Sequence, residues 1–439
     1  MKVYTFSPGG IHPPQQKNTA GTPVIPVSTP DTIVLPLDQH IGRTAEPVAS
    51  KGERVGAGQL IARVGDGISA AIHTPLSGTV TEIGMKRNFS GIPVRSVTIC
   101  VDDGQSVEDV GMPLADIGQA TASEIVAAAS AAGLVGLGGA AFPTAFKIHV
   151  PEDSAIDTVV INGAECEPVL TCDDALMCGH PGEVVAGARL VMKATGANKA
   201  IIGVEDNKPE AIARLRESAA PYAGSVTVAV LKAKYPQGGE RQLVQALTGR
   251  IITPGKLPLS VGVVVQNVAT ARALYRAVAF GEPLTKRIVT VAGAGIARPA
   301  DYLVPVGMSI SALLQQAGAD MERIDKLVAG GPMMGHAIET VDAPVTKALS
   351  AVVAFSGQEA CRRPMDPCVR CGRCVDVCPN ALEPYLIATC GKLGRVDDAA
   401  RAGVMMCMEC GSCSYVCPSS RPITDMIRVA KYLIRKSRK

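Results

Sequence analysis

The middle of the chain, between residues 121 and 280, alternates continuous apolar runs with amphipathic stretches. The apolar runs have strand length, and the stretches between them repeat apolar residues every three to four positions, as a half-buried helix does. The runs are Thr158-Val-Val-Ile-Asn, Ala200-Ile-Ile-Gly-Val-Glu, Ser225-Val-Thr-Val-Ala-Val-Leu and Gly262-Val-Val-Val-Gln, and the helical stretches are 182–195, 209–218 and 240–248. This alternation predicts βαβ units and a largely parallel sheet, whose ligands bind beyond the carboxyl ends of the strands.

The N-terminal quarter has shorter strands and more turns. Residues 1–30 are rich in turn-forming glycine and proline, which predicts an extended arm. From 31 to 110 short apolar strands alternate with turns, and Asp66-Gly67 is a strong hairpin signal. The strands are Thr32-Ile-Val-Leu-Pro, Gln59-Leu-Ile-Ala-Arg-Val, Thr79-Val-Thr-Glu-Ile and Val97-Thr-Ile-Cys-Val.

The turn residues of this β region resemble those of lipoyl and biotinyl carrier domains, which are flattened barrel-sandwiches. The resemblance rests on Gly52-x-x-Val55-x-x-Gly58-Gln59 and on Pro75-x-x-Gly78-x-Val80. In those families a lysine follows the hairpin aspartate and carries the cofactor, whereas here Gly67 follows it. We therefore expect a docking or structural module without a carrier lysine.

Residues 286–355 return to short strands. A strand at Arg287-Ile-Val-Thr-Val, a short helix over 309–317 and a glycine loop over 330–335 are predicted. The pattern resembles the soluble-ligand-binding β-grasp module that lies between flavin and cluster domains in several redox subunits.

One uncharged segment, 125–146, is long enough to cross a bilayer. It consists mostly of Ala, Gly and Ser, and a glycine run would leave backbone groups unsatisfied in lipid. We expect a short helix that leads into a glycine loop, and a protein that is soluble or peripheral. The 439 residues predict several domains, and the net charge of +3, without a basic aromatic patch, argues against nucleic-acid binding.

Two copies of C-x2-C-x2-C-x3-C-P dominate residues 356–439. This is the bacterial run that holds [4Fe–4S] clusters, in which the fourth cysteine ligates the other cluster. The pattern assigns Cys368, Cys371, Cys374 and Cys417 to one cluster, and Cys378, Cys407, Cys410 and Cys413 to the second. The fourth cysteine of each motif is expected to begin a helix. Structural zinc is the competing interpretation, although zinc sites have no use for the C-x3-C-P ending.

The 28 residues between Cys378 and Cys407 allow a helix pair over about 381–403, which predicts a helical, ferredoxin-like domain. Reduced thiolates in these motifs indicate a reducing compartment. The basic, half-apolar C-terminal tail from Lys431 either lies against an anionic membrane or partner, or is a solvated helix end.

Three polar segments of the α/β region suggest a bound nucleotide. Glycines and a lysine in Gly136-Leu-Gly138-Gly139 to Lys147 suit close approach to a phosphate. Asn162-Gly-Ala-Glu165-Cys-Glu167-Pro places carboxylates at the end of an apolar strand, and Lys234-Tyr-Pro-Gln-Gly-Gly-Glu240 runs into a helix start. A plain helix–strand turn explains the first glycine loop about as well on spacing alone.

Together these segments resemble the flavin-carrying, NADH-oxidising subunit of respiratory complex I. Over its whole length the chain is more similar to the C subunit of Rnf complexes, the membrane ferredoxin:NAD+ oxidoreductases. Gly-Gly-Ile-His-Pro-Pro at 9–14, the segments at 163–168 and 235–240, and the paired cysteine motifs carry this resemblance in the same order.

The resemblance implies a multidomain α/β and α+β architecture. Its parts are an N-terminal arm (1–30), a lipoyl-like barrel-sandwich (31–110), a complex I flavin-subunit-like α/β domain (121–280), a β-grasp module (286–355) and a two-[4Fe–4S] ferredoxin-like domain (356–439). It further implies FMN held by Gly138, Gly139, Lys147, Asn162, Glu165, Glu240 and Asn267, and NADH placed by Phe142 and Glu167.

Two departures from the family pattern bear on the flavin loop. Leu137 stands where complex I has an arginine, and Ala141 stands in the usual Ala-Gly-Phe-Pro, which adds a methyl near the expected flavin. The remaining cysteines do not have a known cluster spacing, and we interpret them as structural thiols. They are Cys100, Cys166, Cys172, Cys178, Cys361 and Cys390.

The expected activity is electron transfer between NAD(H), FMN and two [4Fe–4S] clusters, because a flavin exchanges both electron pairs and single electrons. The resemblance implies a peripheral subunit on the cytoplasmic face of the bacterial inner membrane. Its membrane and peripheral partners would translocate ions and link it to ferredoxin. The alternatives are a cobalamin reductase of bacterial microcompartments and a non-catalytic electron relay.

Overall fold

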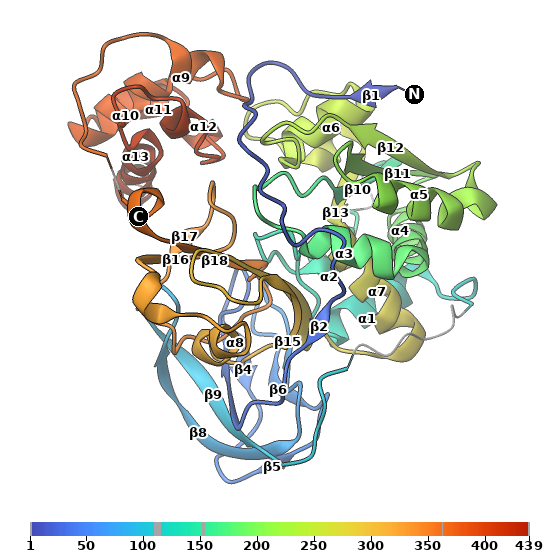
Figure 1. Ribbon diagram of the computed structural model, residues 1–439. Coiled ribbons are helices and arrows are strands. Elements are labelled where there is room, and N and C mark those ends of the chain that lie inside the picture. Colours follow the sequence, from blue (N-terminus) through green and yellow to red (C-terminus); the bar gives the residue numbers. More distant parts are fainter. Residues whose placement is uncertain (1, 109–115, 152–153, 362, 438–439) are drawn as a thin grey trace.

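The computed structural model describes residues 2–108, 116–151, 154–361 and 363–437. Figure 1 shows a green and yellow α/β region beside a golden β-sheet region, with a blue β region below and an orange and red helical region above. Among the described residues, none of the helices is long and apolar enough to span a membrane.

A five-stranded parallel sheet is the centre of the α/β region, with strand order β1-β12-β11-β10-β13. Its inner strands are almost entirely buried, as continuous apolar runs predict. The strands are β1 (Val3–Tyr4), β10 (Thr158–Gly163), β11 (Lys199–Glu205), β12 (Val226–Leu231) and β13 (Val263–Asn267). The helices are α1 (Ala122–Ala131), α2 (Thr144–Ile148), α3 (Cys172–Gly179), α4 (Pro181–Thr195), α5 (Pro209–Ala219), α6 (Glu240–Thr248) and α7 (Val268–Phe280).

The four strands and three helices predicted here are confirmed within two residues at each end. The uncharged segment does form a short helix, α1, followed by a glycine loop. Helices α2, α3 and α7 were not predicted. No turn separates β13 from α7, because Asn267 is both the last residue of the strand and the N-terminal cap of the helix. The sequence therefore has no turn signal at the start of α7.

The N-terminal arm runs along three parts of the molecule (Figure 1). Its strand β1 extends the parallel sheet, with Val3 opposite Val230. Its second strand, β2 (Ile25–Pro26), pairs with β15 at the edge of the next sheet. The arm is extended, as its glycine and proline content predicted, and it adds one edge strand to each of two sheets.

The barrel-sandwich region consists of two antiparallel sheets, with strand orders β3-β9-β8-β5 and β4-β6-β7. The bounds are β3 (Thr32–Pro36), β4 (Glu46–Pro47), β5 (Arg54–Val55), β6 (Leu60–Arg63), β7 (Ile72–His73), β8 (Gly78–Arg87) and β9 (Pro93–Val101). The predicted hairpin links β6 to β7, and Gly67 has a φ of +77° there.

The region after residue 285 forms a six-stranded mixed sheet with order β17-β16-β18-β14-β15-β2. Its elements are β14 (Lys286–Gly293), β15 (Ala300–Pro305), α8 (Ile310–Gln316), β16 (Lys326–Ala329), β17 (His336–Ala337) and β18 (Ala351–Phe355). The predicted strand at Arg287 and helix over 309–317 are confirmed, and Gly330–Gly335 connects β16 to β17.

The C-terminal region is helical over its described residues, with α9 (Arg373–Asp376), α10 (Pro384–Lys392), α11 (Val396–Arg401), α12 (Ser412–Tyr415) and α13 (Ile423–Ser437). The expected helix pair over 381–403 is confirmed as α10 and α11. The expectation that Cys378 and Cys417 begin helices is wrong, because each lies in a turn and the next helix begins only at Pro384 or Ile423. The basic tail belongs to α13 as far as Ser437, and its last two residues lie outside the described residues. This helix buries Ile427, Ala430 and Ile434 and exposes Val429 and Tyr432.

Short 3₁₀ segments connect several of these elements. They are Ala220–Tyr222, Pro258–Val261, Met321–Arg323, Gly357–Glu359 and Val404–Met406.

Candidate functional site

The carboxyl ends of two neighbouring parallel strands bring Asn162 and Asn267 side by side, as Cα partners of β10 and β13. Asn162 Nδ2 donates to Gly238 O at 2.9 Å, which ties the strand end to the 235–240 segment. Asn267 Oδ1 accepts from Ala269 N at 2.8 Å and so caps α7. Both asparagines lie at the carboxyl ends of the parallel strands, which is where open α/β sheets bind their ligands.

The glycine loop reaches the same edge. It is closed by hydrogen bonds from Gly136 N to Phe142 O (2.8 Å) and from Ala141 N to Gly136 O (3.1 Å). Its tip, which includes Gly138 and Gly139, is exposed. A Cβ added at Gly138 would lie 3.5 Å from Asn267 Cβ, so the loop passes directly over the strand end. Gly139, with a φ of +108°, has open space around it.

The departure at Ala141 lies inside this loop. Its φ of +48° is in the left-handed region that favours glycine, and the residue is buried. The extra methyl therefore packs within the protein. Half-buried Phe142 follows it.

Lys147 and Glu240 join the glycine loop to the start of α6. Lys147 Nζ lies 2.8 Å from Glu240 Oε1, and both side chains remain partly exposed. The loop, the two asparagines and the 235–240 segment thus form one cradle, with a cation and a carboxylate at its rim.

Glu165 is buried in the turn after β10, where its φ is +47°. Its Oε1 accepts from Asp173 N at 2.7 Å, whereas Oε2 has no hydrogen-bond partner among the described residues. Lys17 Nζ and Lys208 Nζ each lie 4.0 Å from Oε2. Burial raises the pKa of Glu165 to about 8, against the opposing charges of the two lysines.

Lys17 reaches this turn from the N-terminal arm. Its Nζ donates to the carbonyl oxygens of Glu165 (2.9 Å), Glu167 (3.0 Å) and Leu170 (2.6 Å). Lys208 Nζ donates to Ala164 O at 2.8 Å. The acidic turn is therefore shaped by two buried lysines that lie outside every motif noted in the sequence.

Glu167 connects the turn to the β-grasp loop over 330–335. Its two carboxylate oxygens accept from Met333 N (3.0 Å) and Met334 N (2.9 Å). Burial raises the pKa of Glu167 to about 7, although these hydrogen bonds oppose the shift. A Cβ at Gly331 would lie 2.3 Å from Glu167 Oε2, so the loop packs tightly over the carboxylate.

The second set of cysteines comes together in space. Cys378, Cys407, Cys410 and Cys413 line one small cavity of about 20 Å³. Burial raises the pKa of Cys407 to about 11 and that of Cys413 to about 12. Thiols in such apolar surroundings lose their protons when a metal centre supplies the compensating positive charge.

The first set is more open. Cys368 and Cys371 are exposed, and their negative charge raises the pKa of neighbouring Cys374 in addition to the larger effect of burial. Cys417 is half-buried in the same helical region. The described residues contain no group of three or more His, Cys, Asp or Glu side chains arranged around a single metal ion.

The other cysteines belong to neither motif, although Cys390 packs in the same apolar cluster as Cys374 and Cys413, and Cys166 packs in the cluster that contains Cys410. Cys100 and Cys361 are exposed, and Cys172 and Cys390 are buried. Cys166 lies in the acidic turn, where its Sγ accepts from Gly238 N at 3.3 Å and burial raises the pKa of its thiol.

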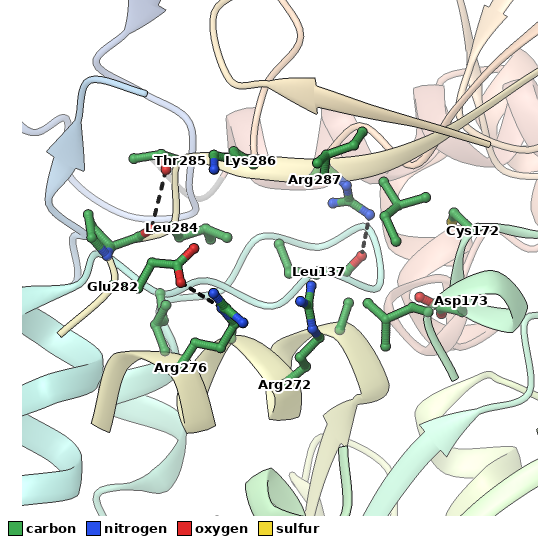
Figure 2. A pocket seen from close by; sticks show the side chains of 17 residues that line it. Leu137, Cys172, Asp173, Arg272, Arg276, Glu282, Leu284, Thr285, Lys286 and Arg287 are labelled. Atoms are coloured by element: carbon green, nitrogen blue, oxygen red, sulfur yellow. Dashed lines mark hydrogen bonds and ion pairs between the residues drawn. The ribbon is translucent and has the colours of Figure 1, made fainter. Parts of the chain in front are cut away.

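A cavity of about 70 Å³ lies behind the glycine loop, between α7 and β14. Figure 2 shows Arg276 paired with Glu282, at 2.6 Å, and Arg287 donating to Leu137 O, at 3.1 Å. None of the residues predicted to bind FMN or NADH lines it. Its volume suits a few ordered waters, and it is not the cradle described above.

The cradle fits a flavin nucleotide on its own chemistry. Open glycine backbone at its tip allows close approach, and Lys147 supplies a cation for a phosphate. The Oε2 atom of Glu165, buried and without a hydrogen-bond partner in the described part of the chain, provides a polar atom for a polar ring system.

Four family models match successive regions of the chain. Residues 5–105 match the RnfC barrel sandwich hybrid domain, and residues 129–276 match the Nuo51 FMN-binding domain. Residues 288–337 match the SLBB domain, and residues 361–418 match the 4Fe-4S dicluster domain. The cofactors of the chain are therefore FMN and two [4Fe–4S] clusters, and the fold class expected from the sequence is confirmed.

A solved structure shares the fold. The NAD+-reducing [NiFe]-hydrogenase superposes with a TM-score of 0.51 at 22% identity, covering 72% of this chain and 62% of that chain.

Several relatives match nearly the whole chain. It is 40% identical over 426 residues to the C subunit of the ion-translocating oxidoreductase complex of Rhodobacter capsulatus, covering 96% of this chain and 82% of the relative. It is 39% identical over 432 residues to the C subunit of the Na+-translocating ferredoxin:NAD+ oxidoreductase complex of Acetobacterium woodii, covering 98% and 97%. On this identity, on the FMN and cluster domains, and on the barrel-sandwich at its N-terminal end, the chain belongs to the family of C subunits of Rnf-type ion-translocating oxidoreductase complexes.

Proposed function

We propose that this subunit exchanges electrons between NAD(H), FMN and its two [4Fe–4S] clusters. It would act as the peripheral member of an Rnf-type complex on the cytoplasmic face of the bacterial inner membrane. Membrane and peripheral subunits of the same complex translocate the ion and connect the subunit indirectly to ferredoxin.

One observation carries this proposal: the second cysteine set lies directly against the flavin domain. Tyr235, which begins one segment of the cradle, donates its hydroxyl to Cys410 O at 2.7 Å. Gln242, in α6, donates to Pro379 O (3.2 Å) and to Asn380 Oδ1 (2.9 Å), next to Cys378. A flavin in the cradle and a cluster in this set are therefore neighbours across a single interface.

FMN, when bound, supplies the exchange between electron pairs and single electrons. The residues that would hold it lie at the strand ends and in the glycine loop. They are Gly138, Gly139, Lys147, Asn162, Glu165, Glu240 and Asn267. Phe142, which is half-buried beside the exposed loop tip, would stack on NADH.

Glu167 would contribute to the dinucleotide site together with its neighbouring loop. Because Met333 N and Met334 N hold its carboxylate, a dinucleotide that contacts Glu167 also meets the β-grasp loop. The loop then helps to exclude water from the reacting atoms.

The test is anaerobic purification followed by addition of NADH. We expect one FMN and about eight iron atoms per chain, since each cluster holds four irons. NADH should bleach the flavin. A yellow protein that NADH leaves oxidised would contradict the catalytic proposal.

The alternative of a non-catalytic relay is tested by substitution. Lys147→Ala with Glu165→Ala should lower the FMN content, because the rim cation and the buried carboxylate are both lost. Unchanged flavin content would favour the relay. The barrel-sandwich match over 5–105 favours the Rnf interpretation over a cobalamin reductase, for which we expect no such domain in this place.

A further inference from the structure

The two cysteine motifs share one sequence pattern and one backbone geometry but face different surroundings. The second set faces the flavin domain through Tyr235, and the arm also covers it, since a Cβ added at Gly9 would lie 2.6 Å from the Cys378 carbonyl oxygen. The first set has exposed cysteines, Cys368 and Cys371. In an electron route that starts at the cradle, the first set therefore lies farther from the flavin than the second. We call the cluster of the second set, with the motif that begins at Cys407, the inner one, and the cluster of the first set, with the motif that begins at Cys368, the outer one.

Matched glycines show the same difference. Gly372 and Gly411 follow the second cysteine of each motif and have the same left-handed backbone, with a φ of +79° in both. A Cβ at Gly411 would lie 2.9 Å from Met333 O, whereas Gly372 has nothing within 4 Å. The inner loop is thus covered by the β-grasp loop, and its counterpart is open.

The side chains at matched positions differ accordingly. Glu409, in the inner motif, is paired with Lys431 (2.7 Å) and Arg428 (3.1 Å). Its counterpart, Arg370, is exposed and has no ion-pair partner among the described residues. Buried Ser412 corresponds to exposed Arg373.

Apolar side chains complete the open face. Val369 is 66% exposed and Met365 is 47% exposed, so both remain in contact with water. Between Cys368 and Cys374 the loop carries two arginines and no acidic residue, while Asp366 and Asp376 lie on either side. A centre that is apolar and cationic, with metal ligands at the surface, suits a partner whose own surface is acidic around a redox group.

We propose that Met365, Val369, Arg370 and Arg373 form the docking face for an acidic one-electron carrier domain, through which electrons enter or leave the outer cluster. This rests on the proposed function, because it assigns a direction to the same electron route. Two reduced carriers would each release one electron here, and NAD+ with one proton would take up both electrons at the cradle to form NADH.

The test uses the full chain, loaded with FMN and clusters. A reduced acidic ferredoxin is the probe, NAD+ is the acceptor, and NADH formation is followed at low and high ionic strength. Arg370→Glu with Arg373→Glu should lower kcat/KM for the ferredoxin about tenfold or more at low salt and flatten its salt dependence. Arg370→Lys with Arg373→Lys should react nearly as the parent does.

Arg43→Glu, at an exposed arginine of the barrel-sandwich region, is the control for a charge reversal elsewhere on the surface and should have no such effect. Iron content and bleaching of the flavin by NADH should be unchanged in all variants, which separates this proposal from the proposed function itself. A ferredoxin reaction that is equally fast in the Glu variant and in Arg43→Glu would overturn the proposal. The docking proposal would also fail if the lower kcat/KM of the double Glu variant were explained by a changed reduction potential of the outer cluster. The same holds if that variant lost binding to anionic vesicles and kept its reaction with ferredoxin.

Discussion

At the scale of single residues, the acidic turn after β10 holds more buried charge than its size suggests. Glu165, Lys17 and Lys208 lie together out of water, and one oxygen of Glu165 lacks a hydrogen bond among the described residues. Burying such a carboxylate costs free energy unless it is fully paired. The turn therefore lowers the stability of the unliganded protein, which agrees with our proposal that a ligand binds there.

Replacement of Glu165 by glutamine should stabilise the apoprotein at high pH. Its pKa is raised from 4.5 to about 8 on folding, so the folded state holds the proton more tightly. The contribution of this carboxyl group to folding stability is most favourable below its unfolded pKa of 4.5, and it is lost as the pH rises to its folded pKa of about 8. We expect Glu165→Gln to raise stability by about 1 kcal/mol or more near pH 8, with little change near pH 5.

Thermal unfolding of the apoprotein across this pH range measures the effect. Exposed Glu359→Gln is the control and should follow the parent at every pH. A parallel shift of Glu165→Gln at both ends of the range would contradict the assignment.

At the scale of elements, regular segments were predictable and their connections were not. The β10, β11, β12 and β13 runs are apolar throughout, so their type and position follow from the sequence. The pairing of β1 and β2 was not predictable, because a two-residue strand in a proline-rich arm has no periodicity of its own. Each of these two strands forms only because it pairs with the edge of a sheet built by residues far away in the sequence.

Lys17 should prove to hold the arm to the acidic turn. Lys17→Met leaves three carbonyl oxygens without their donor, which we expect to cost about 2–4 kcal/mol and to lower FMN content. Chemical denaturation and flavin quantification measure the two effects. Exposed Lys51→Met should change neither, and a Lys17→Met protein with full stability would refute the role.

Gly9 should prove essential for seating the arm against the cluster domain. Gly9 and Gly21 have similar φ values, +71° and +75°, but only Gly9 has backbone atoms where a Cβ would lie. Gly21→Ala should therefore cost only the conformational strain, about 1 kcal/mol. Gly9→Ala should in addition make the arm sensitive to protease. Equal digestion of the two variants would argue against the contact.

At the scale of the whole molecule, Tyr235 links the flavin cradle to the inner cysteine set. Its hydroxyl donates to Cys410 O, and its ring packs with Ile11 of the arm. The family resemblance indicated this segment, but its meeting with a cysteine 175 positions away depends on tertiary packing. The same holds for Glu167 and the loop at Met333.

Tyr235→Phe should separate flavin reduction from cluster reduction. Loss of the hydroxyl removes one buried hydrogen bond, worth about 1 kcal/mol, and loosens the interface. In rapid-mixing experiments NADH should bleach the flavin at the parent rate, while reduction of the iron–sulfur chromophore slows. Exposed Tyr432→Phe serves as the reference, and identical kinetics in both variants would exclude a positioning role for Tyr235.

The arm also imposes an order on assembly. Its residues precede their partners in the chain by hundreds of positions, because Val3 pairs with Val230, Ile25 pairs with Tyr302, and Gly10 N donates to Val377 O at 2.9 Å. During synthesis the arm therefore cannot complete its contacts until the chain has been made as far as Val377, because contacts of long sequence separation form late. Cofactors can therefore be delivered to a chain whose arm has not yet docked, and the contacts of the arm with the acidic turn and with the backbone of Cys378 form last.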